Sequence, residues 1–298
     1  MRLTAALVMC TRNRPDDVDG ALTTIAGQTR AAEMVAVVDS SNSTATREVV
    51  REHGTAWPSS RPPIHVPSAP SLTHQRRVGL ACTVSDVVLF VDDDVRLGAD
   101  YVAAVMQVFE TEAGAGAAIG GVGGYMVNSE PRRVRALDRI FGLDSVEEGK
   151  MLASGRNIPV VSEPLGLLDV DWLSGAAMAY RRTLLECEPP DEASFPFEGE
   201  DADLSFRIGR HARLVVTPDA QYMHLESAMN RVSGATQAEA ELAARLRRVV
   251  AQPDRLSMRA ARLAAAYQLA KYTATGVATL SRRRLAVARG TAAALRRA

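Results

Sequence analysis

The stretch Val87-Val88-Leu89-Phe90-Val91-Asp92-Asp93-Asp94 decides the fold of this chain. Five consecutive apolar residues, mostly β-branched or aromatic, predict a strand that is buried on both faces of a parallel sheet. In open α/β sheets, ligands bind beyond the carboxyl ends of the strands. Three carboxylates follow this strand directly, so they are expected to emerge at the ligand-binding edge.

The three aspartates predict a metal site. Like charges packed this closely repel one another unless a cation or hydrogen-bond donors offset them. Carboxylate oxygens suit a hard divalent ion such as Mg²⁺ or Mn²⁺, which commonly also holds substrate phosphates. The alternative is a solvated acidic turn, and the buried strand before the aspartates argues against it.

Strand and helix signals alternate around this stretch. Strands are expected at 3–10, 34–38 and 64–66, and helices at 16–28, 44–53, 71–84 and 98–112. This order predicts an α/β fold with a doubly wound, mostly parallel sheet flanked by helices. The strand ends at Thr11, Asp39 and Asp92 would then open onto one edge of the sheet.

The second half of the chain is less regular. Several glycines lie in an expected strand region at 119–127, and glycine within a strand marks close approach of another backbone or a ligand. Residues 131–163 are polar and poorly periodic, which is typical of a mobile loop over a site. A short strand is expected at 213–216.

The charges divide the chain into two parts. The 298 residues carry 35 basic and 35 acidic side chains, but thirteen basic residues and one acid lie from Arg245 onward. We therefore expect a globular domain at 1–235 and a basic helical C-terminal extension at 236–298, with two helices split near Pro253. Nearly all basic residues are arginine, which is typical of a GC-rich bacterial genome.

Two interpretations of the extension stay open. Its amphipathic helices can pack on the catalytic domain, or they can lie on an anionic membrane as a peripheral contact. The triplet Arg282, Arg283 and Arg284 favours the membrane. Nucleic acid is not expected as a partner, because the body is acidic and aromatic residues make up only 5% of the chain.

The cysteines and the hydropathy pattern indicate a cytoplasmic protein. Cys10, Cys82 and Cys187 are far apart and match no metal-ligand spacing, so reduced thiols are expected. The apolar stretch after Met1 and Arg2 is too short for a signal peptide. No run of 18 apolar residues predicts a membrane span. The predicted location is the cytoplasm, with attachment to the inner face of the cell membrane as the alternative.

Five short motifs follow one another between residues 3 and 225. They are Thr11-Arg12-Asn13-Arg14-Pro15, Val37-Val38-Asp39-Ser40-Ser41, Gln75-Arg76-Arg77-Val78-Gly79, Asp92-Asp93-Asp94 and Glu200-Asp201-Ala202-Asp203-Leu204-Ser205-Phe206-Arg207. In content and order they resemble the motifs of the inverting nucleotide-sugar glycosyltransferases of glycosyltransferase family 2, which have the GT-A fold. Arg77 departs from the family pattern, which has asparagine there.

The resemblance implies which residues hold the donor. Asp94 is expected to ligate Mn²⁺ or Mg²⁺, and His224 lies where some relatives supply a further ligand, although a structural histidine is the alternative. Arg76 would stabilise the charge that builds on the departing phosphate. The other nucleotide-binding residues implied are Thr11, Arg12, Arg14, Asp39 and Asp92.

The resemblance also implies a catalytic base and an acceptor site. Inversion at the anomeric carbon needs a base that deprotonates the acceptor hydroxyl, and Asp201 is the candidate. Trp172 and Glu200 are expected to bind the acceptor. An acidic cluster that complements a helix N-terminus is the alternative for the carboxylates, and an ordinary core residue is the alternative for Trp172.

The sequence therefore predicts a metal-dependent hexosyl- or deoxyhexosyltransferase of bacterial polysaccharide or glycoconjugate synthesis. Its donor would be a UDP-, dTDP- or GDP-sugar, and its acceptor a hydroxyl of a saccharide or lipid-linked molecule. A nucleotidyltransferase is the alternative enzyme, but the Gly-rich phosphate loop with lysine after the first strand is missing. A non-catalytic nucleotide-sugar-binding protein is the alternative outside enzymes, and the intact aspartates argue against it.

Overall fold

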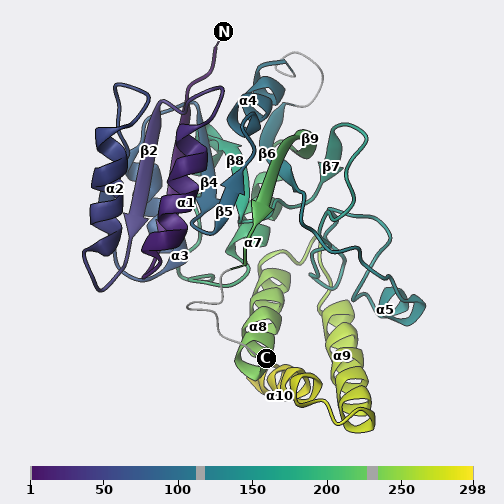
Figure 1. The fold of residues 1–298 in the computed structure, drawn as a ribbon. Coiled ribbons are helices and arrows are strands. Elements are labelled where there is room, and N and C mark those ends of the chain that lie inside the picture. The colour runs from purple at the N-terminus through teal and green to yellow at the C-terminus, as the bar shows by residue number, and fades with distance from the viewer. Residues whose placement is uncertain (1, 112–117, 227–233, 298) are drawn as a thin grey trace. The chain divides into compact units, whose positions relative to one another are not determined.

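The computed structural model describes residues 2–111, 118–226 and 234–297. The chain forms two compact units (Figure 1). The first comprises Met1–Pro131 and Val160–Met229, and the second comprises Arg132–Pro159 and Asn230–Ala298.

The first unit is built around a mixed sheet (Figure 1). Its first four strands are β1 (Ala5–Thr11), β2 (Met34–Asp39), β3 (Ile64–Pro67) and β4 (Val87–Asp92). They lie in the order β3-β2-β1-β4 and every neighbouring pair is parallel, as the alternating pattern predicts. Thr11 pairs with Asp39, and Cys10 pairs with Asp92. The expected strand ends therefore do meet at one edge.

Five further strands complete the sheet. They are β5 (Val95–Leu97), β6 (Ile119–Met126), β7 (Leu168–Val170), β8 (Ala177–Arg181) and β9 (Arg213–His224). The sheet continues from β4 in the order β8-β6-β9-β5, with β7 beside β9. β8 runs antiparallel to both β4 and β6, and β9 is parallel to β6. Strands β5, β7 and β8 were not predicted, and β9 extends well beyond the expected 213–216.

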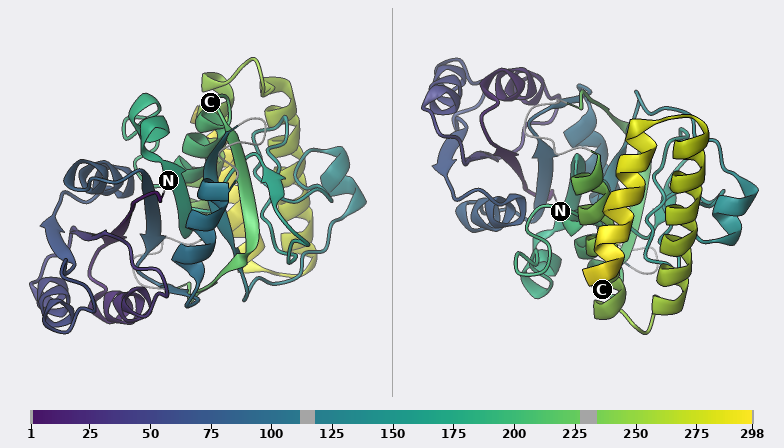
Figure 2. Two further views of the ribbon diagram at one scale, coloured as in Figure 1. Left: turned by 90° about the horizontal axis from the view of Figure 1, so that it is seen from above. Right: turned by 90° about the horizontal axis from the view of Figure 1, so that it is seen from below.

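Helices cover both faces of the sheet (Figure 2). Leu7 and Met9 of β1 pack in the same core as residues of α1 (Pro15–Ala26), α2 (Ala45–Thr55) and α4 (Tyr101–Thr111). Val8 and Cys10 point the other way, into a core with α3 (Leu72–Cys82), α6 (Arg182–Cys187) and α7 (Glu200–Ile208). Because successive strand residues face opposite sides, a continuous apolar run is what such a doubly covered sheet requires.

Local signals fix the helix that carries Arg76. The hydroxyl of Ser71 accepts a hydrogen bond from the amide of His74 and so caps α3. Farther along, Gly79 lies directly against β1, since a Cβ there would stand 2.2 Å from a methyl carbon of Val8. The glycine lets α3 approach the sheet closely.

The glycines of β6 have the predicted cause. A Cβ at Gly124 would stand 2.2 Å from the carbonyl oxygen of Ala220, and one at Gly121 would stand 2.8 Å from the ring of Tyr180. Close approach of neighbouring strands therefore explains these positions.

The second unit is helical. It contains α5 (Ala136–Ile140), α8 (Ala235–Ala251), α9 (Met258–Ala278) and α10 (Arg282–Arg297). The prediction of two helices after residue 235 is wrong, because the chain breaks a second time after α9. Leu280 adopts a left-handed conformation there, with φ of 49°, and no glycine or proline marks the turn in the sequence.

Residues 132–159 belong to this helical unit. They include α5 and a β-bridge between Met151 and Asn157, so part of the expected loop 131–163 forms regular structure. The helices of the expected extension also lie in this unit. The division of the chain into a domain at 1–235 and an extension at 236–298 stays a prediction.

Two further observations concern the cysteines and the helices. Cys10, Cys82 and Cys187 are all free, with Cys10 buried. Within the described part of the chain, every helix is too short or too polar to cross a bilayer.

Candidate active site

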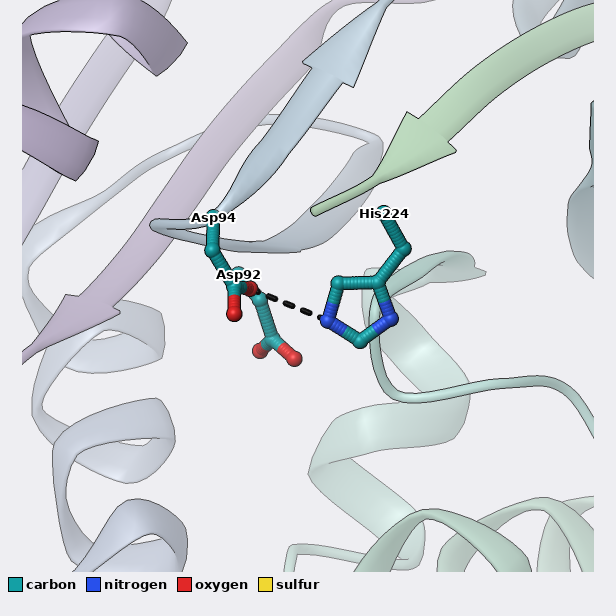
Figure 3. A group of neighbouring side chains, drawn as sticks. All are labelled: Asp92, Asp94 and His224. Carbon is teal, nitrogen blue, oxygen red and sulfur yellow. Dashed lines mark hydrogen bonds and ion pairs between the residues drawn. The ribbon is translucent and has the colours of Figure 1, made fainter. Parts of the chain in front are cut away.

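Three side chains that could ligate a metal meet at the end of β4. One ligand atom each of Asp92, Asp94 and His224 lies within 4.8 Å of the others (Figure 3). The pairing of β5 with β9 sets Val95 opposite His224, so the histidine reaches the residue that follows the aspartates. The sequence analysis named all three residues as candidates for the site, but it did not predict the pairing of β5 with β9 that brings His224 to the aspartates.

Asp94 and His224 are in direct contact. Nε2 of His224 lies 3.0 Å from Oδ1 of Asp94, and the Asp94 side chain is only 2% exposed. Asp92 is the more open carboxylate, at 30%. Burial raises the pKa of Asp92, the guanidinium of Arg76 opposes this rise, and the negative charge of Asp94 adds to it. Two carboxylates and an imidazole are a donor set that suits Mn²⁺.

The middle aspartate has partners of its own. Asp93 accepts hydrogen bonds from Oγ1 of Thr11 at 2.7 Å and from Nη1 of Arg14 at 3.0 Å. The same nitrogen of Arg14 lies 3.6 Å from Asp94. Burial raises the pKa of Asp93 to about 6, although Thr11 and Arg14 both lower it. Asp93 therefore ties the loop after β1 to the aspartates.

The loops after β1 and β2 are joined by short hydrogen bonds. Asn13, with a left-handed φ of 55°, donates its amide to Oγ of Ser41 at 2.7 Å. Asp39 accepts from the amide of Ser41 at 2.8 Å and lies 3.0 Å from Nε2 of His65. Arg12 lies exposed between these contacts. The predicted nucleotide-binding residues of the two loops thus occupy one edge of the sheet.

Arg76 is buried among carboxylates. Its side chain is 2% exposed, and Nη1 lies 2.6 Å from Oε1 of Glu200, while Nη2 lies 3.8 Å from Asp92. Burial opposes the charge of Arg76, but Glu200 and Asp92 together raise its pKa above the ordinary value. Burial raises the pKa of Glu200, against the lowering effect of Arg76. The structure thus pairs Glu200, expected at the acceptor, with Arg76.

Asp201 is oriented by backbone amides. Oδ2 accepts from the amide of Gly175 at 3.0 Å, and Oδ1 accepts from the amide of Ala202 at 2.7 Å. The carbonyl oxygen of Gly175 accepts from Nη2 of Arg76 at 3.2 Å. Gly175 therefore links the candidate base to the arginine that is expected at the donor phosphate.

The segment that carries Trp172 is fastened on both sides. Ser205 of α7 accepts from the amide of Leu173 at 3.0 Å, and the amide of Asp92 donates to the carbonyl of Ala176 at 2.9 Å. Trp172 itself is half-buried, and Leu173 beside it is in the core.

Sequence reasoning missed two residues of this edge. Nε2 of Gln75 donates to the carbonyls of Thr11 and Val38 at 2.9 and 2.7 Å, so its buried side chain joins the ends of β1 and β2. His65 holds Asp39 from the neighbouring strand. Gln75 lies inside a recognised motif, and that position was the one signal available. Nothing in the sequence pointed to His65.

Solved structures share the fold. The mannosyltransferase PcManGT of Pyrobaculum calidifontis, in complex with GDP-Man and Mn²⁺, has a TM-score of 0.61 at 16% identity, covering 99% of this chain and 88% of that one. GalNAc-T7 with UDP, GalNAc and Mn²⁺ has a TM-score of 0.57 at 13% identity, covering 77% of this chain and 45% of that one. S. aureus TarS 1–349 in complex with UDP has a TM-score of 0.56 at 17% identity, covering 83% and 65%.

These likenesses concern the fold, and they agree with the predicted GT-A type architecture. This chain spans less than half the length of the GalNAc-T7 chain. No curated protein sequence matches it. The model of glycosyl transferase family 2 matches residues 6–174, which is more than half of the 298 residues. The chain therefore belongs to glycosyl transferase family 2.

Proposed function

We propose that this protein transfers a sugar from a nucleoside-diphosphate sugar to an acceptor hydroxyl, with inversion and with a requirement for Mn²⁺ or Mg²⁺. The observation that carries the proposal is the convergence of Asp92, Asp94 and His224 at the end of β4. Asp201 is linked to this cluster by Gly175, whose amide donates to Asp201 and whose carbonyl oxygen accepts from Arg76, which lies 3.8 Å from Asp92. A cation site and a candidate base are the two parts that such a reaction needs.

The residues present fit a divalent cation. Asp94 and His224 would hold it, with Asp92 binding ribose or metal-bound water. The two carboxylates lie close together and Asp94 is buried, an arrangement whose repulsion a cation offsets. When bound, the cation would supply electrostatic stabilisation of the diphosphate. The Mn²⁺ named with PcManGT and GalNAc-T7 is consistent with this choice.

The donor nucleotide is assigned to the loops after β1 and β2. Thr11, Arg12, Arg14 and Asp39 present polar groups there. Hydrogen bonds from Thr11 and Arg14 to Asp93 hold the first loop, and Ser41 joins Asn13 to Asp39 across the two loops. Arg76 stands 3.8 Å from Asp92 and would stabilise the negative charge of the leaving diphosphate. UDP-, dTDP- and GDP-sugars are the proposed donors.

The acceptor is activated by Asp201. Its carboxylate takes the proton of the acceptor hydroxyl, the hydroxyl oxygen forms the new bond to the anomeric carbon, and the bond to the diphosphate breaks on the opposite face. The amides of Gly175 and Ala202 orient the carboxylate for that proton. Trp172 and Glu200 remain the proposed acceptor residues, for a saccharide or a lipid-linked molecule. The proposed transferred sugar is a hexose or deoxyhexose, and the proposed pathway is bacterial polysaccharide or glycoconjugate synthesis.

The helical unit offers a contact for an anionic membrane. Val277 and Leu280 are 61% and 88% exposed, and Arg282, Arg283 and Arg284 that follow are exposed as well. Apolar side chains beside arginines are the composition of an interfacial contact. We therefore propose a cytoplasmic enzyme that touches the inner face of the cell membrane through residues of the 236–298 extension.

A donor screen tests the proposal. The protein is incubated with UDP-, dTDP- and GDP-sugars, Mn²⁺ and candidate saccharide acceptors, and the released nucleotide is identified. Release of a nucleoside diphosphate that needs acceptor and metal supports sugar transfer. Pyrophosphate exchange into a nucleoside triphosphate would indicate a nucleotidyltransferase instead, and donor binding without any turnover would indicate a binding protein.

A further inference from the structure

A cavity of about 380 Å³ lies wholly within the helical unit. Its walls come from the segment 132–159 and from helices α8, α9 and α10. The volume falls within the roughly 300–1,000 Å³ of small-molecule sites. None of the residues assigned above to donor, metal or base lines it.

Four of the charged residues that line the cavity form two ion pairs, and the charges cancel within each pair. Arg132 is paired with Asp144, and Nζ of Lys271 lies 2.7 Å from both carboxylate oxygens of Asp138. These four residues therefore add little net charge to the cavity.

The remaining charges are mostly positive. Arg156 and Arg283 line the cavity, and Glu241 is the carboxylate left there after the pairing. Within the described residues, no hydrogen bond or ion pair engages the guanidinium of Arg156 or Arg283. Nε2 of Gln237 donates to Glu241 at 3.0 Å, so a neighbour already occupies part of that carboxylate.

A buried arginine stands behind the cavity wall. Arg245 is 4% exposed, and its Nη2 donates to Oε1 of Gln268, a lining residue, at 3.5 Å. Its Nη1 is buried and finds no hydrogen-bond partner in the described part of the chain. A buried donor without a partner costs free energy. Arg245 does not itself line the cavity, so what it adds there is its positive charge.

The electrostatic environment of Arg245 points the same way. Burial lowers the pKa of Arg245, and the positive charges of Arg156 and Arg248 lower it further, to about 9. The value stays above neutral pH, so the guanidinium is charged in the cell. Several like charges thus gather with one carboxylate to offset them, and an anion would relieve their repulsion.

We propose that this cavity binds the phosphate or diphosphate group of an organic ligand. The planar fork of a guanidinium matches phosphate oxygens in a bidentate arrangement. Leu143, Ile158 and Val287 also line the cavity and offer apolar contact to the organic part. Such a site is separate from the donor site in the first unit and holds a second phosphorylated molecule.

Calorimetric titration of the full-length protein with inorganic pyrophosphate in EDTA tests the proposal. The chelator removes divalent ions, so phosphate binding that depends on the aspartates at β4 does not contribute. A second titration uses dihexanoyl phosphatidate, a soluble lipid with the same phosphate chemistry. Saturable binding of pyrophosphate points to a soluble ligand, and binding of phosphatidate alone points to a lipid headgroup. If neither pyrophosphate nor phosphatidate binds, the proposal is overturned.

Matched variants locate the site. Arg156→Gln combined with Arg283→Gln removes two charge-assisted contacts and is expected to weaken the bound probe by about tenfold or more. Arg289→Gln, on an exposed residue of α10 outside the cavity lining, is expected to leave the affinity unchanged. Asp94→Ala is expected to retain binding too. Equal affinity in the double variant and the wild type would overturn the proposal, as would loss of binding in Asp94→Ala.

Discussion

The amide of Gly175 donates a hydrogen bond of 3.0 Å to Oδ2 of Asp201. The other end of the same residue accepts from Arg76 through its carbonyl oxygen. A peptide segment from the middle of the chain thus sets the distance between the candidate base and the arginine that faces Asp92. Both side chains therefore contact the same glycine.

Substitution of Asp201 separates catalysis from binding. Asp201→Asn keeps the size of the side chain but removes the basic carboxylate. We expect turnover to fall by about 10²-fold or more, as for the loss of a general base, while donor affinity stays nearly unchanged. Initial rates and donor titration measure the two effects. Asp219→Asn, on an exposed residue of β9, is the matched control. Full activity of Asp201→Asn would indicate another base, either Glu200 or Asp171, the carboxylate that precedes Trp172 in the chain.

Substitution of Gly175 tests the spacing directly. A Cβ there would stand 2.9 Å from Nη2 of Arg76 and 3.2 Å from Cβ of Asp201. We expect Gly175→Ala to lower kcat and to reduce the free energy of unfolding by about 1–3 kcal/mol, the cost of overpacking. The control is Gly166→Ala, where an added Cβ meets nothing within 4 Å. If both variants show wild-type kcat, the glycine does not set the site geometry.

Metal binding is expected to depend on Asp94. Asp94→Ala should abolish Mn²⁺-dependent binding of a nucleoside diphosphate, and His224→Ala should weaken Mn²⁺ affinity because an imidazole ligand is lost. Calorimetry with Mn²⁺ and with nucleoside diphosphate measures both. His211→Ala removes a histidine that contacts Glu188, away from the aspartates, and serves as the control. Undiminished nucleotide binding by Asp94→Ala would refute the metal assignment, and unchanged Mn²⁺ affinity of His224→Ala would leave the histidine structural.

Acid sensitivity is expected to come partly from Glu110. Its hydrogen bonds with Arg30, together with one from the amide of Leu3, lower the pKa of Glu110 to about 2 in the folded protein, from 4.5. A carboxyl whose folded pKa is depressed stabilises the fold above its unfolded pKa, and this contribution is lost as the pH falls. Between about pH 4.5 and pH 2, the wild type should therefore lose more stability than Glu110→Gln. Urea midpoints across that range measure it, and parallel curves would contradict the assignment.

Membrane contact is expected to depend on the turn between α9 and α10. We expect the full-length protein to sediment with anionic vesicles at low salt and to be released at high salt. Arg282→Gln with Arg284→Gln should cost about 2 kcal/mol of binding, roughly thirtyfold in partitioning. Leu280→Ser should weaken it independently, because an exposed apolar contact is removed.

The control variant for vesicle binding also lacks two positive charges, but in the first unit. Arg47→Gln with Arg51→Gln changes two exposed residues of α2 in the first unit, and it should bind vesicles as the wild type does. If the wild type does not sediment with anionic vesicles at low salt, the arginines of α10 serve packing or oligomerisation instead.

The parallel half of the sheet could be predicted because its signals are local. The apolar run before Asp92 and the serine that caps α3 each reveal their structure within a few residues. The antiparallel strands gave no such signal. β5 is three residues long and exists through its pairing with β9, which comes more than a hundred residues later. Short strands of this kind are specified by their neighbours rather than by their own composition.

The contacts within the candidate site were the harder part. Sequence motifs named Arg76 and Glu200 separately, one for the donor and one for the acceptor. The two lie 124 positions apart in sequence, and their side chains form an ion pair of 2.6 Å. No pattern within either motif specifies that pairing, because it depends on how α3 and α7 pack on the same face of the sheet.

The interrupted first unit has a consequence for synthesis on the ribosome. Residues 132–159 emerge before 160–234, yet the helices with which they form a compact unit begin at Ala235. At about 5–20 residues per second, translation of the intervening stretch takes roughly 4 to 15 seconds. During this time residues 132–159 are exposed to solvent without the helices α8, α9 and α10. Ten of its 28 residues are charged, a composition that keeps an unfolded chain solvated until the last helices arrive.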